Sequence, residues 1–413
     1  MGAGAAGLVA AERAASRGLK TLLLERNRKP GVKILMSGGT RCNLTQATDA
    51  RGIVAAYGPP GRFLHSALAA LSPQELVELV EAEGVPTKIE ETGKIFPVSN
   101  KAADVLMAFL NRLHRSGARL ALDESLLDFQ RSADPAAEGS FVLTTSTRTI
   151  AAPRVIITTG GQSYPGGGTT GDGYRWAATF GHTIVPPRPA LVPITTSAPW
   201  ARELSGLTIP DVSIRLLEPS SNPSNQKPLI LDTRRGALLF THFGLSGPVV
   251  LDISRHVSGH PRPQSLQLEC DFLPNVKSAE LDDQLRQQAV REGKKQLISL
   301  IPDLLPRRLA ELLLHEASLP ADKKAGELSN TNRTALVRSL KQFPIPVTGT
   351  RGFAKAEVTA GGVSLDEINS STLQSKLVPG LYFAGEVLDL DGPIGGYNFQ
   401  AAFSTGWLAG MSV

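Results

Sequence analysis

The first seven residues carry a glycine pattern that is typical of nucleotide-binding loops. Gly2, Gly4 and Gly7 have the spacing GxGxxG, a small-residue segment follows at 8–17, and an apolar β-type run then ends in Glu25. In a dinucleotide-binding βαβ unit, such glycines allow a tight turn and a close approach to a pyrophosphate, and an acid about 20 residues later binds ribose hydroxyls. Here Gly7 and Glu25 are 18 residues apart. The pattern predicts a dinucleotide site, and the alternative is a Gly/Ala turn before a structural helix.

The same unit lacks its usual first strand. The fingerprint normally follows a strand at the centre of a parallel sheet, but only Met1 precedes it in this sequence. Without that strand, the backbone groups of its neighbours lack partners. Either the true start lies upstream, which is our expectation, or the chain is a shortened form that folds or holds its cofactor poorly.

A polar stretch at residues 30–46 follows the strand that ends in Glu25. It offers cations and backbone donors that suit a phosphate or a flavin ring, at Lys33, Ser37, Gly38, Gly39, Arg41 and Asn43. The alternative is a solvated surface loop. Cys42 lies in the stretch, but no second cysteine is nearby, which argues against a redox-active thiol.

Another glycine-rich loop follows the apolar strand predicted at 155–159. That strand stops at Gly160, and the loop from Gly166 to Gly173 leads into a helix from about Tyr174. The loop is either a second phosphate cradle, for a nicotinamide dinucleotide, or a crossover that shapes the cofactor pocket. We favour the crossover, because no acid ends a following strand.

The C-terminal part has a second strand–turn–helix pattern. An apolar strand at 380–384 runs into Gly385 and Glu386, and a small-residue helix to about residue 409 follows the turn formed by Gly395, Gly396, Tyr397 and Asn398. The strand end suits the ribityl or pyrophosphate part of a cofactor, and the helix N-terminus would stabilise an anionic reduced flavin. The carboxyl ends of parallel strands meet at one crevice, so this turn and the first glycine loop should converge. The alternative is a Gly-capped helix packed on the sheet.

His242 is the one catalytic candidate, and a weak one. It stands at the edge of the turn made by Gly244, Ser246 and Gly247. The absence of a GxSxG motif argues against acyl transfer. His242 could donate a proton beside a redox cofactor; the alternative is a hydrogen-bonded loop histidine. The seven histidines show no close metal-ligand spacing, so no metal is expected.

The element pattern predicts an α/β fold with an insertion. Helices are expected at 72–83 and 101–116, a hairpin at 141–151, period-2 strands at 212–216 and 266–272, and helices within 280–342. A Pro-rich crossing near 186–193 marks a change of character. The predicted domains are a dinucleotide-binding part at 1–190, an inserted β-plus-helix domain at 191–345, and a return to the first domain at 346–413.

Composition limits the class of protein. The 413 residues are 41% hydrophobic and 20% charged, with 43 Lys and Arg against 38 Asp and Glu, a net charge of +5. That excess, without a dense basic run, suits small anionic molecules, and no nucleic-acid partner is expected. No apolar run reaches the ~18–20 residues of a membrane span and no signal peptide is recognisable, so a cytoplasmic protein without a membrane partner is predicted.

Six motifs together resemble a known family. They are GAGAAGL (2–8), KILMSGGTRCNLT (33–45), GGQSYPGGGTTGDGY (160–174), FTHFGLSGP (240–248), AEVTAGGV (356–363) and LYFAGEVLDLDGPIGGYNFQAA (381–402). In this order, over nearly the whole chain, they resemble the bacterial BaiN/YhiN-type flavoproteins. These are described as NAD(P)/FAD-dependent oxidoreductases, some of them as aminoacetone-oxidase-like.

The resemblance implies a glutathione-reductase-like FAD domain, split by an inserted domain, that binds FAD tightly. By similarity, FAD would be held by Ala6, Glu25, Arg26, Lys33 and Gly38, with the backbone of Leu126 near the adenine. The ribityl and isoalloxazine end would lie at Gly385, Glu386 and the turn 395–398. In this chain Thr40 stands where the family often has Gly, and Gln46 where Asn is usual.

Together these features predict an FAD-dependent oxidoreductase that moves hydride between the flavin and a small organic substrate, with NAD(P)H as reductant. The alternatives are an amine oxidase that uses dioxygen, a non-catalytic flavin-binding protein such as a redox-sensing or RNA-associated module, and an inactive remnant. The sequence specifies neither the substrate nor the oligomeric state.

Overall fold

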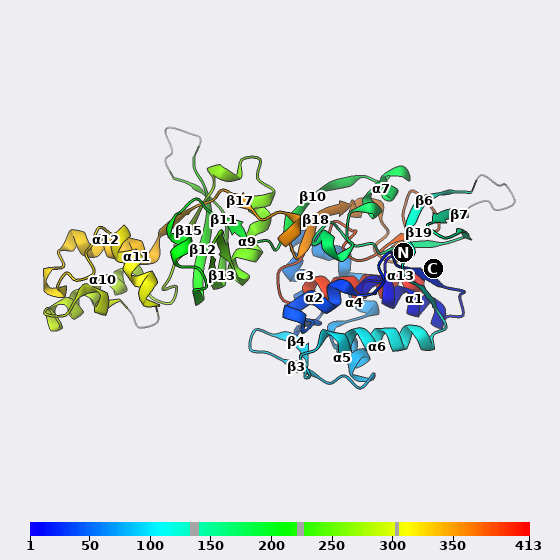
Figure 1. Ribbon diagram of the computed structural model, residues 1–413, viewed down its shortest axis with the longest axis horizontal. Helices are drawn as coiled ribbons and strands as arrows, with labels where there is room; N and C mark the ends of the chain where they lie inside the picture. Colours follow the sequence, from blue (N-terminus) through cyan, green and yellow to red (C-terminus); the bar gives the residue numbers. More distant parts are fainter. Residues whose placement is uncertain (133–139, 221–226, 302–304) are drawn as a thin grey trace. The chain divides into compact units, whose positions relative to one another are not determined.

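A computed structural model describes residues 1–132, 140–220, 227–301 and 305–413. The chain divides into two compact units, and each is described by itself. Unit 1 comprises Met1–Pro189 and Glu357–Val413, and unit 2 comprises Ala190–Ala356 (Figure 1). The predicted α/β fold with an inserted β-plus-helix part is therefore confirmed.

Unit 1 consists of short strands and of helices that cover them. Its helices are α1 (Ala5–Ser16), α2 (Val32–Thr40), α3 (Ala50–Tyr57), α4 (His65–Ala70), α5 (Pro73–Glu81), α6 (Ala102–Arg115), α7 (Asp172–Thr179) and α13 (Tyr397–Ser412). Its strands are β1 (Leu22–Leu24), β2 (Thr45–Gln46), β3 (Thr87–Ile89), β4 (Lys94–Pro97), β5 (Arg119–Ala121), β6 (Leu126–Arg131), β7 (Phe141–Thr145), β8 (Thr149–Ala152), β9 (Val155–Ile157), β10 (Ile184–Ala190), β18 (Val358–Val363) and β19 (Leu381–Phe383).

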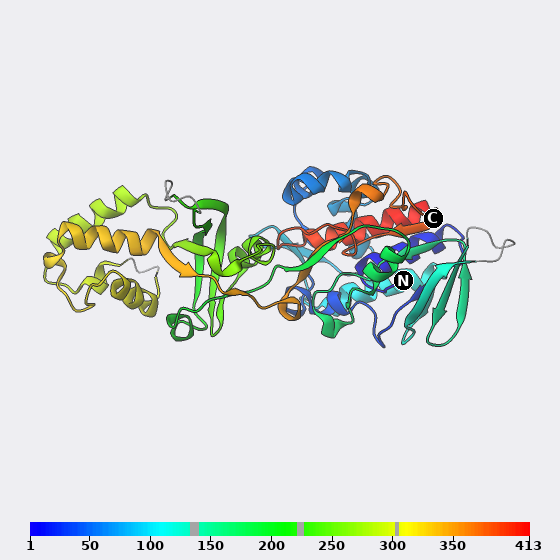
Figure 2. The ribbon, with the colours of Figure 1, turned by 90° about the horizontal axis from the view of Figure 1, so that it is seen from above.

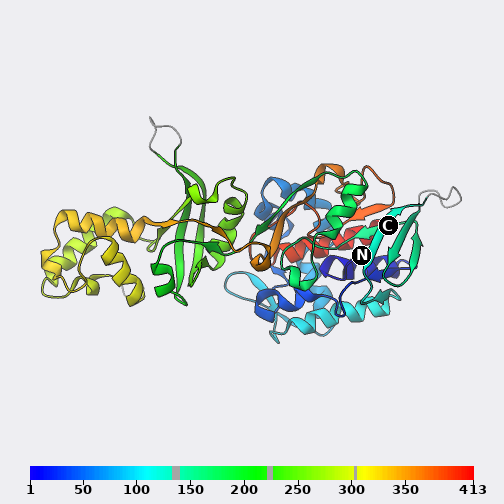
Figure 3. The same ribbon diagram turned by 45° about the horizontal axis from the view of Figure 1, so that its top comes forward.

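The centre of unit 1 contains two parallel strand pairs, β1 with β5 and β9 with β19. Met1 and Gly2 lie between them, in the place of the first strand of the βαβ unit. The N–H of Gly2 donates to the carbonyl of Leu24 at 2.8 Å, and the N–H of Thr158 donates to the carbonyl of Met1 at 2.9 Å. Two residues thus connect the carboxyl ends of both pairs. Apart from this core, unit 1 has the antiparallel sheets β2-β4-β3 and β6-β7-β8 (Figure 3) and the pair β10-β18.

Helices α1 and α13, from opposite ends of the chain, lie side by side (Figure 2). Their contact depends on glycine. A Cβ at Gly406 would lie 2.3 Å from the carbonyl oxygen of Ala6, and a Cβ at Gly410 would lie 2.4 Å from that of Ala10. Real Cβ atoms do not come that close, so the two helices can approach to this distance only with glycine at both positions.

Local sequence signals account for most helix boundaries. Ser72 accepts the N–H of Glu75, and Glu75 accepts the N–H of Ser72, which forms the capping box expected at the start of α5. The predicted helix at 101–116 and hairpin at 141–151 are also confirmed. The interpretation of 30–46 as a loop is wrong in part, because α2 occupies Val32–Thr40. Its apolar side packs on α6, with Ile34 fully buried, and this tertiary contact stabilises the helical residues before Ser37, whereas Gly38 and Gly39 have non-helical backbone angles.

Unit 2 is one seven-stranded sheet with helices. Its strands are β11 (Ile194–Thr195), β12 (Thr208–Glu218), β13 (Leu229–Thr241), β14 (Gly244–Ser246), β15 (Gln267–Asp271), β16 (Phe343–Pro346) and β17 (Gly349–Thr350), in the order β16-β15-β12-β13-β14-β11-β17. Its helices are α8 (Trp200–Glu203), α9 (Pro248–Ser258), α10 (Ser278–Arg291), α11 (Arg307–Glu316) and α12 (Asn330–Lys341). Residues 302–304, within the predicted helical stretch, lie outside the described residues.

The predicted period-2 strands form the centre of this sheet. Ile214 pairs with Cys270 and Leu216 with Leu268, and all four side chains are fully buried. Cys270 is therefore a core residue, as the alternation predicts.

The sheet continues beyond residue 345, where the inserted domain was expected to end. β16 pairs with β15, and β17 pairs with β11, so both strands belong to unit 2. The chain returns to unit 1 at Glu357. Among the described residues, every helix is too short or too polar to cross a membrane.

Candidate functional site

The first glycine loop is held by the acid at the end of β1. Glu25 is buried, and its Oε2 accepts the N–H of Ala3 at 2.7 Å while its Oε1 accepts the N–H of Asn27 at 2.9 Å. Each carboxylate oxygen has a second lone pair for a further donor. The structure thus brings the predicted acid directly against the predicted loop.

The same loop has the shape and the donors that a pyrophosphate needs. A Cβ at Gly7 would lie 1.9 Å from the carbonyl oxygen of Gly2, and a Cβ at Gly2 would lie 2.6 Å from that of Thr158, so the backbone fills both places. At Gly4, by contrast, a Cβ would meet nothing within 4 Å. Gly4 is also the N-cap of α1, which has no side-chain cap and no acid in its first turn. Open space before an uncapped helix N-terminus fits the diphosphate of FAD.

Helix α2 ends in a left-handed turn. Gly38, Gly39 and Thr40 have φ values of 56°, 68° and 68°. A Cβ at Gly38 would lie 2.9 Å from Cε1 of Phe96, so only glycine fits there. The hydroxyl of Ser37 donates to the carbonyl of Ile34 at 2.9 Å. A side chain is costly at Thr40, because the left-handed conformation crowds Cβ.

Asn43 and Cys42 follow this turn and point into the unit. With its amide oriented to pair at both ends, Asn43 accepts the N–H of Gly396 at 2.9 Å and donates to the carbonyl of Thr45 at 3.1 Å. Asn43 therefore connects this segment to the C-terminal turn. Burial, opposed by a hydrogen bond from Ser37, raises the pKa of the Cys42 thiol to about 12, so the thiol stays protonated and inert.

Lys33 and Glu386 form the most charged part of the site. Nζ of Lys33 lies 2.5 Å from Oε2 of Glu386, and their side chains are only 25% and 17% exposed. The carboxylate also accepts the Ser163 hydroxyl at 2.7 Å and the N–H of Thr359 at 2.9 Å. Ser163 in turn accepts from Lys33 at 2.5 Å. Ser163 and Thr359 are not among the residues predicted from the sequence; their only signal there is that they lie in the motifs at 160–174 and 356–363.

The second glycine-rich loop is held by the residues that follow Glu25. Arg26 donates to the Thr170 hydroxyl at 2.7 Å and to Asp172 at 2.8 Å, and Asn27 donates to the carbonyl of Gly167 at 3.1 Å. Arg26 is thus already paired with a carboxylate. This bracing favours the interpretation of the loop as a crossover.

Gly385 brings the C-terminal pattern to the first loop. With φ at 78°, it donates its N–H to the Thr405 hydroxyl at 2.9 Å, and a Cβ there would lie 2.9 Å from Cβ of Ala6. The segment after the carboxyl end of β9 places Gly160 nearby, since a Cβ on Gly160 would lie 4.0 Å from Oε2 of Glu386. The two ends of the chain therefore do converge.

The turn before α13 is fixed by its own side chains. Asn398 accepts the N–H of Gly392 at 2.8 Å and donates to the carbonyl of Gly392 at 2.9 Å, so it braces the preceding loop. The hydroxyl of Tyr57 donates to the carbonyl of Tyr397 at 3.0 Å. Gly395 and Gly396 have φ values of 132° and 94°, which suit glycine. The turn holds the N-terminus of α13 in one orientation.

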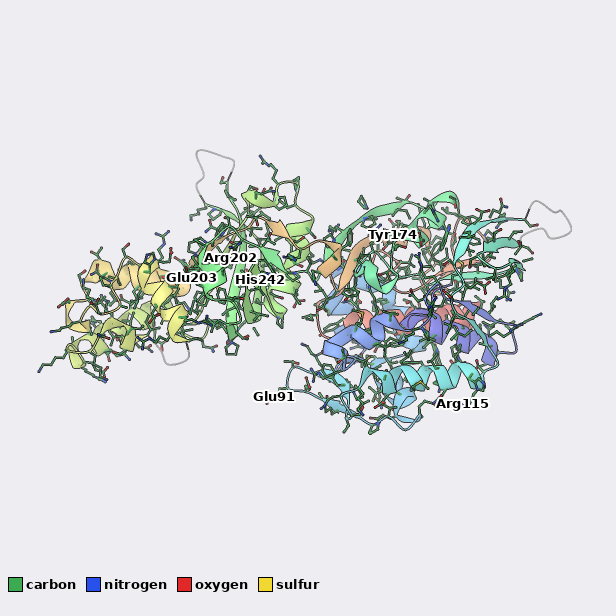
Figure 4. The ribbon with its side chains drawn as sticks, viewed as in Figure 1. Glu91, Arg115, Tyr174, Arg202, Glu203 and His242 are labelled. Carbon is green, nitrogen blue, oxygen red and sulfur yellow. The ribbon has the colours of Figure 1, made fainter. Side chains whose placement is uncertain are left out.

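Two further candidates, Leu126 and His242, lie on other segments of the chain. Leu126 begins β6, two residues after Glu124, whose N–H donates to the carbonyl of Glu25 at 2.9 Å. His242 is exposed in the turn between β13 and β14 of unit 2, whereas the glycine loops and Tyr174 belong to unit 1 (Figure 4). His242 and the predicted cofactor loops therefore belong to different units. In the described part of the chain, no group of His, Cys, Asp or Glu could hold a metal ion.

Comparison with known proteins identifies relatives of full length. One is the "ribosomal RNA dihydrouridine synthase" of Escherichia coli (strain K12), 33% identical over 410 residues, which are 98% of this chain and 95% of the relative. A protein of the same name from Haemophilus influenzae is also 33% identical, over 100% of this chain and 97% of its own. The "3-dehydro-bile acid delta(4,6)-reductase" of Clostridium scindens is 32% identical, with coverage of 100% and 97%.

Solved structures and a family model agree on the fold. A 3-ketosteroid delta1-dehydrogenase from Sterolibacterium denitrificans superposes with a TM-score of 0.50 at 15% identity, covering 99% of this chain and 97% of its own. The model described as "HI0933-like protein Rossmann domain" matches residues 1–412. The chain belongs to the HI0933-like family of Rossmann-fold, FAD-binding oxidoreductases.

Proposed function

We propose that this protein reduces a carbon–carbon double bond conjugated with a carbonyl group, and that its substrate is a uridine in ribosomal RNA. The observation that carries the proposal is that relatives aligned over almost the whole of both chains have names with this chemistry in common. Dihydrouridine forms when hydrogen adds across C5=C6 of uracil, which is conjugated with the C4 carbonyl. A 3-oxo steroid with Δ4,6 double bonds contains the same kind of bond.

The reaction balances with NAD(P)H as the reductant. A hydride adds to C6 and a proton to C5 of the uracil ring, and NAD(P)⁺ is released, so one proton is consumed from solvent. When bound, FAD supplies the ring that accepts and donates hydride. The chain would bind and orient this group: the N-terminus of α1 would hold the diphosphate, and the N-terminus of α13 would stabilise negative charge on the ring.

Lys33 and Glu386 fix the relative position of these elements. Their ion pair joins α2 to the segment after β19, and the bonds of Glu386 to Ser163 and Thr359 add the segments after β9 and in β18. A site held from four segments is rigid, which favours one orientation of the bound group.

A nucleic-acid substrate departs from the expectation from overall composition. The net charge of +5 is modest for the whole chain, but it is not evenly distributed. Unit 2 holds 21 of the 43 Lys and Arg and 16 of the 38 Asp and Glu, which leaves 22 of each in unit 1. The full excess therefore belongs to unit 2, which supports a polyanionic substrate. Ribosomal RNA also agrees with the predicted cytoplasmic location.

The experiment combines a flavin readout with product detection. The purified protein, loaded with FAD, is mixed anaerobically with NADPH or NADH, and loss of the visible flavin bands is followed. It is then incubated with unmodified ribosomal RNA made by transcription, and the digested nucleosides are analysed by mass spectrometry. We expect bleaching by the nicotinamide and a dihydrouridine peak that needs both protein and reductant.

The same assay separates the alternatives. Reduction of a steroid dienone without dihydrouridine would favour a small-molecule reductase, as the Clostridium relative suggests. A flavin that is bleached by an amine and restored by dioxygen would favour the oxidase. If FAD-loaded protein shows neither, the reductase proposal is wrong.

A further inference from the structure

Unit 2 carries the whole positive excess of the chain, and many of its cations are not neutralised within the unit. Arg202, Arg308 and Arg338, for example, are exposed and form no ion pair with any residue that the structure describes. Other cations of unit 2 form ion pairs that neutralise their charge, such as Arg235 with Asp211 and Lys341 with Asp271. The unpaired cations are available to an anionic partner.

One group of these cations lies on two chain segments that run antiparallel. The N–H of Ala325 donates to the carbonyl of Lys295 at 2.8 Å, and the N–H of Gly326 donates to that of Gly293 at 3.0 Å. The two segments approach closely at Gly293 and Gly326, where a Cβ on Gly326 would lie 3.3 Å from Cα of Gly293. The pairing gathers Lys294, Lys323 and Lys324, which form no ion pair in the described part of the chain; we call these three the basic tip.

The tip is not purely cationic. Lys295 is paired with Glu292 at 2.9 Å, and Asp322 and Glu327 lie on the same two segments. It therefore attracts phosphate groups by a modest local excess, without selecting a base.

A second feature could recognise a base. The guanidinium carbon of Arg351 lies 4.4 Å from the centre of the Phe243 ring, and the His242 ring meets the same ring edge-on at 5.0 Å. Among the described residues, no carboxylate pairs with Arg351. An exposed guanidinium plane on an aromatic ring is a surface on which an unpaired nucleobase stacks.

The backbone holds this stack in place. The N–H of Arg351 donates to the carbonyl of Pro193 at 3.0 Å, and the N–H of Thr196 donates to the carbonyl of Phe243 at 3.3 Å. β11 and β17 pair between these bonds. Pro193 lies four residues after Pro189, and Arg351 lies six residues before Glu357, so the stack is at the end of unit 2 where the chain enters and leaves it.

From these observations we infer that unit 2 is the RNA-binding part of the protein: the basic tip attracts the phosphate backbone, and the Phe243–Arg351 stack holds an unpaired base. The inference rests on the proposed RNA substrate and assigns its binding surface. An enzyme that acts on a base must take that base out of its stack, and a platform for a neighbouring base lowers the cost of doing so. A membrane surface would use the cations but gives no role to the planar stack.

The test measures RNA binding rather than turnover. Fluorescence anisotropy of labelled dodeca-uridylate and of a ribosomal RNA transcript gives Kd for the oxidised, FAD-loaded protein across a series of KCl concentrations. Three changes at the basic tip, K294Q, K323Q and K324Q, are combined in one variant. Since each phosphate contact contributes about 0.7–0.9 to the slope of log Kd against log salt, we expect that slope to fall by about 2.

The stack is tested by changes that keep or remove one property at a time. R351K keeps the charge but loses the guanidinium plane, and F243A removes the ring. Each should weaken binding about tenfold with an unchanged salt slope. F243W keeps an aromatic ring at this position and should bind RNA as the unchanged protein does. The matched control is K20Q with K101Q and K376Q, three exposed lysines of unit 1, which should bind as the unchanged protein does. Flavin content and the urea midpoint show that each variant is folded.

The outcomes separate this inference from the proposed function. If tip and stack variants bind like the unchanged protein, or if the unit 1 control weakens binding as much, the inference is wrong even where dihydrouridine forms. If binding follows the expected pattern but no dihydrouridine forms, the surface is supported and the proposed function fails. The inference about unit 2 would also be wrong if the protein bound anionic phospholipid vesicles as tightly as RNA, with the same salt dependence, and the tip and stack variants lost that binding.

Discussion

Nζ of Lys33 lies 2.5 Å from Oε2 of Glu386, although the two residues are 353 positions apart in the chain. The pair joins the stretch after the first glycine loop to the strand end in the C-terminal motif. Its half-buried position makes it a structural connection between the two parts of the chain that form unit 1.

Removing one partner of this pair should destabilise the flavin-free protein. We expect K33M or E386Q to lower the free energy of unfolding by about 1–3 kcal/mol, less than for a fully buried pair because water still reaches both groups. A double-mutant cycle in urea should give a coupling of about 1 kcal/mol or more. The exposed pair Arg28–Asp123, 3.6 Å apart, is the control and should couple by less than about 0.5 kcal/mol. An equal coupling in both pairs would contradict this role.

Gly4→Ala should separate cofactor binding from folding. The residue has φ −82° and ψ −168°, which alanine adopts readily, and its Cβ would enter open space. We therefore expect the free energy of unfolding to change by less than about 1 kcal/mol, while FAD binding weakens at least tenfold because the methyl group occupies the approach of the diphosphate. Titration of flavin fluorescence measures the affinity. Gly166→Ala also places its Cβ in open space and should leave FAD affinity unchanged. If FAD binding weakened in Gly166→Ala but not in Gly4→Ala, the diphosphate site would lie at the second glycine-rich loop.

Thr40→Gly should stabilise the protein. Thr40 is exposed at φ 68°, where a side chain costs about 1–2 kcal/mol, and part of that gain is offset by the greater freedom of glycine in the unfolded chain. A net gain of about 0.5–1 kcal/mol is expected from urea unfolding. Thr92→Gly, at an exposed turn residue without positive φ, should give no gain. Loss of stability at position 40 would show that its hydroxyl matters more than the strain.

His182 should make stability depend on pH. Burial lowers its pKa from the ordinary 6.5, against the opposing effect of Glu367, whose Oε2 lies 3.2 Å from Nδ1. In the unfolded chain the ring is protonated first as pH falls, so stability is complete above about pH 6.5 and is lost as pH drops through the lower folded pKa. Urea midpoints between pH 5.5 and 7.5 should show this slope and show it reduced in H182Q. His315, which is 84% exposed, is the control, and H315Q should leave the slope unchanged.

Local patterns predicted the parts of this protein whose signals lie within a few residues. The capping box at Ser72 and Glu75, the glycine turn before α1 and the alternation around Cys270 each depend on neighbours in sequence. The convergence of the two ends was also predictable, because the carboxyl ends of parallel strands share one edge.

Relationships between distant segments were not predictable in this way. Whether Asn43 faces a cofactor or holds the N–H of Gly396 depends on how two remote segments pack. The same holds for Arg26, which is occupied by Asp172, and for α2, whose helix depends on the surface of α6. A residue type identifies what a side chain can bind, whereas the fold decides which partner reaches it first.

The side-by-side packing of α1 and α13 has a consequence for synthesis on the ribosome. All of unit 2 is translated before β19 and α13, so unit 2 can fold during synthesis while α1 is still waiting for its partner. Domains generally fold as they emerge, but here the glycine loop receives its last neighbour only after the final helix has left the exit tunnel. Nascent chains halted before α13 should therefore contain a protease-resistant unit 2 and no bound flavin, and the cofactor should enter only after α13 has been made.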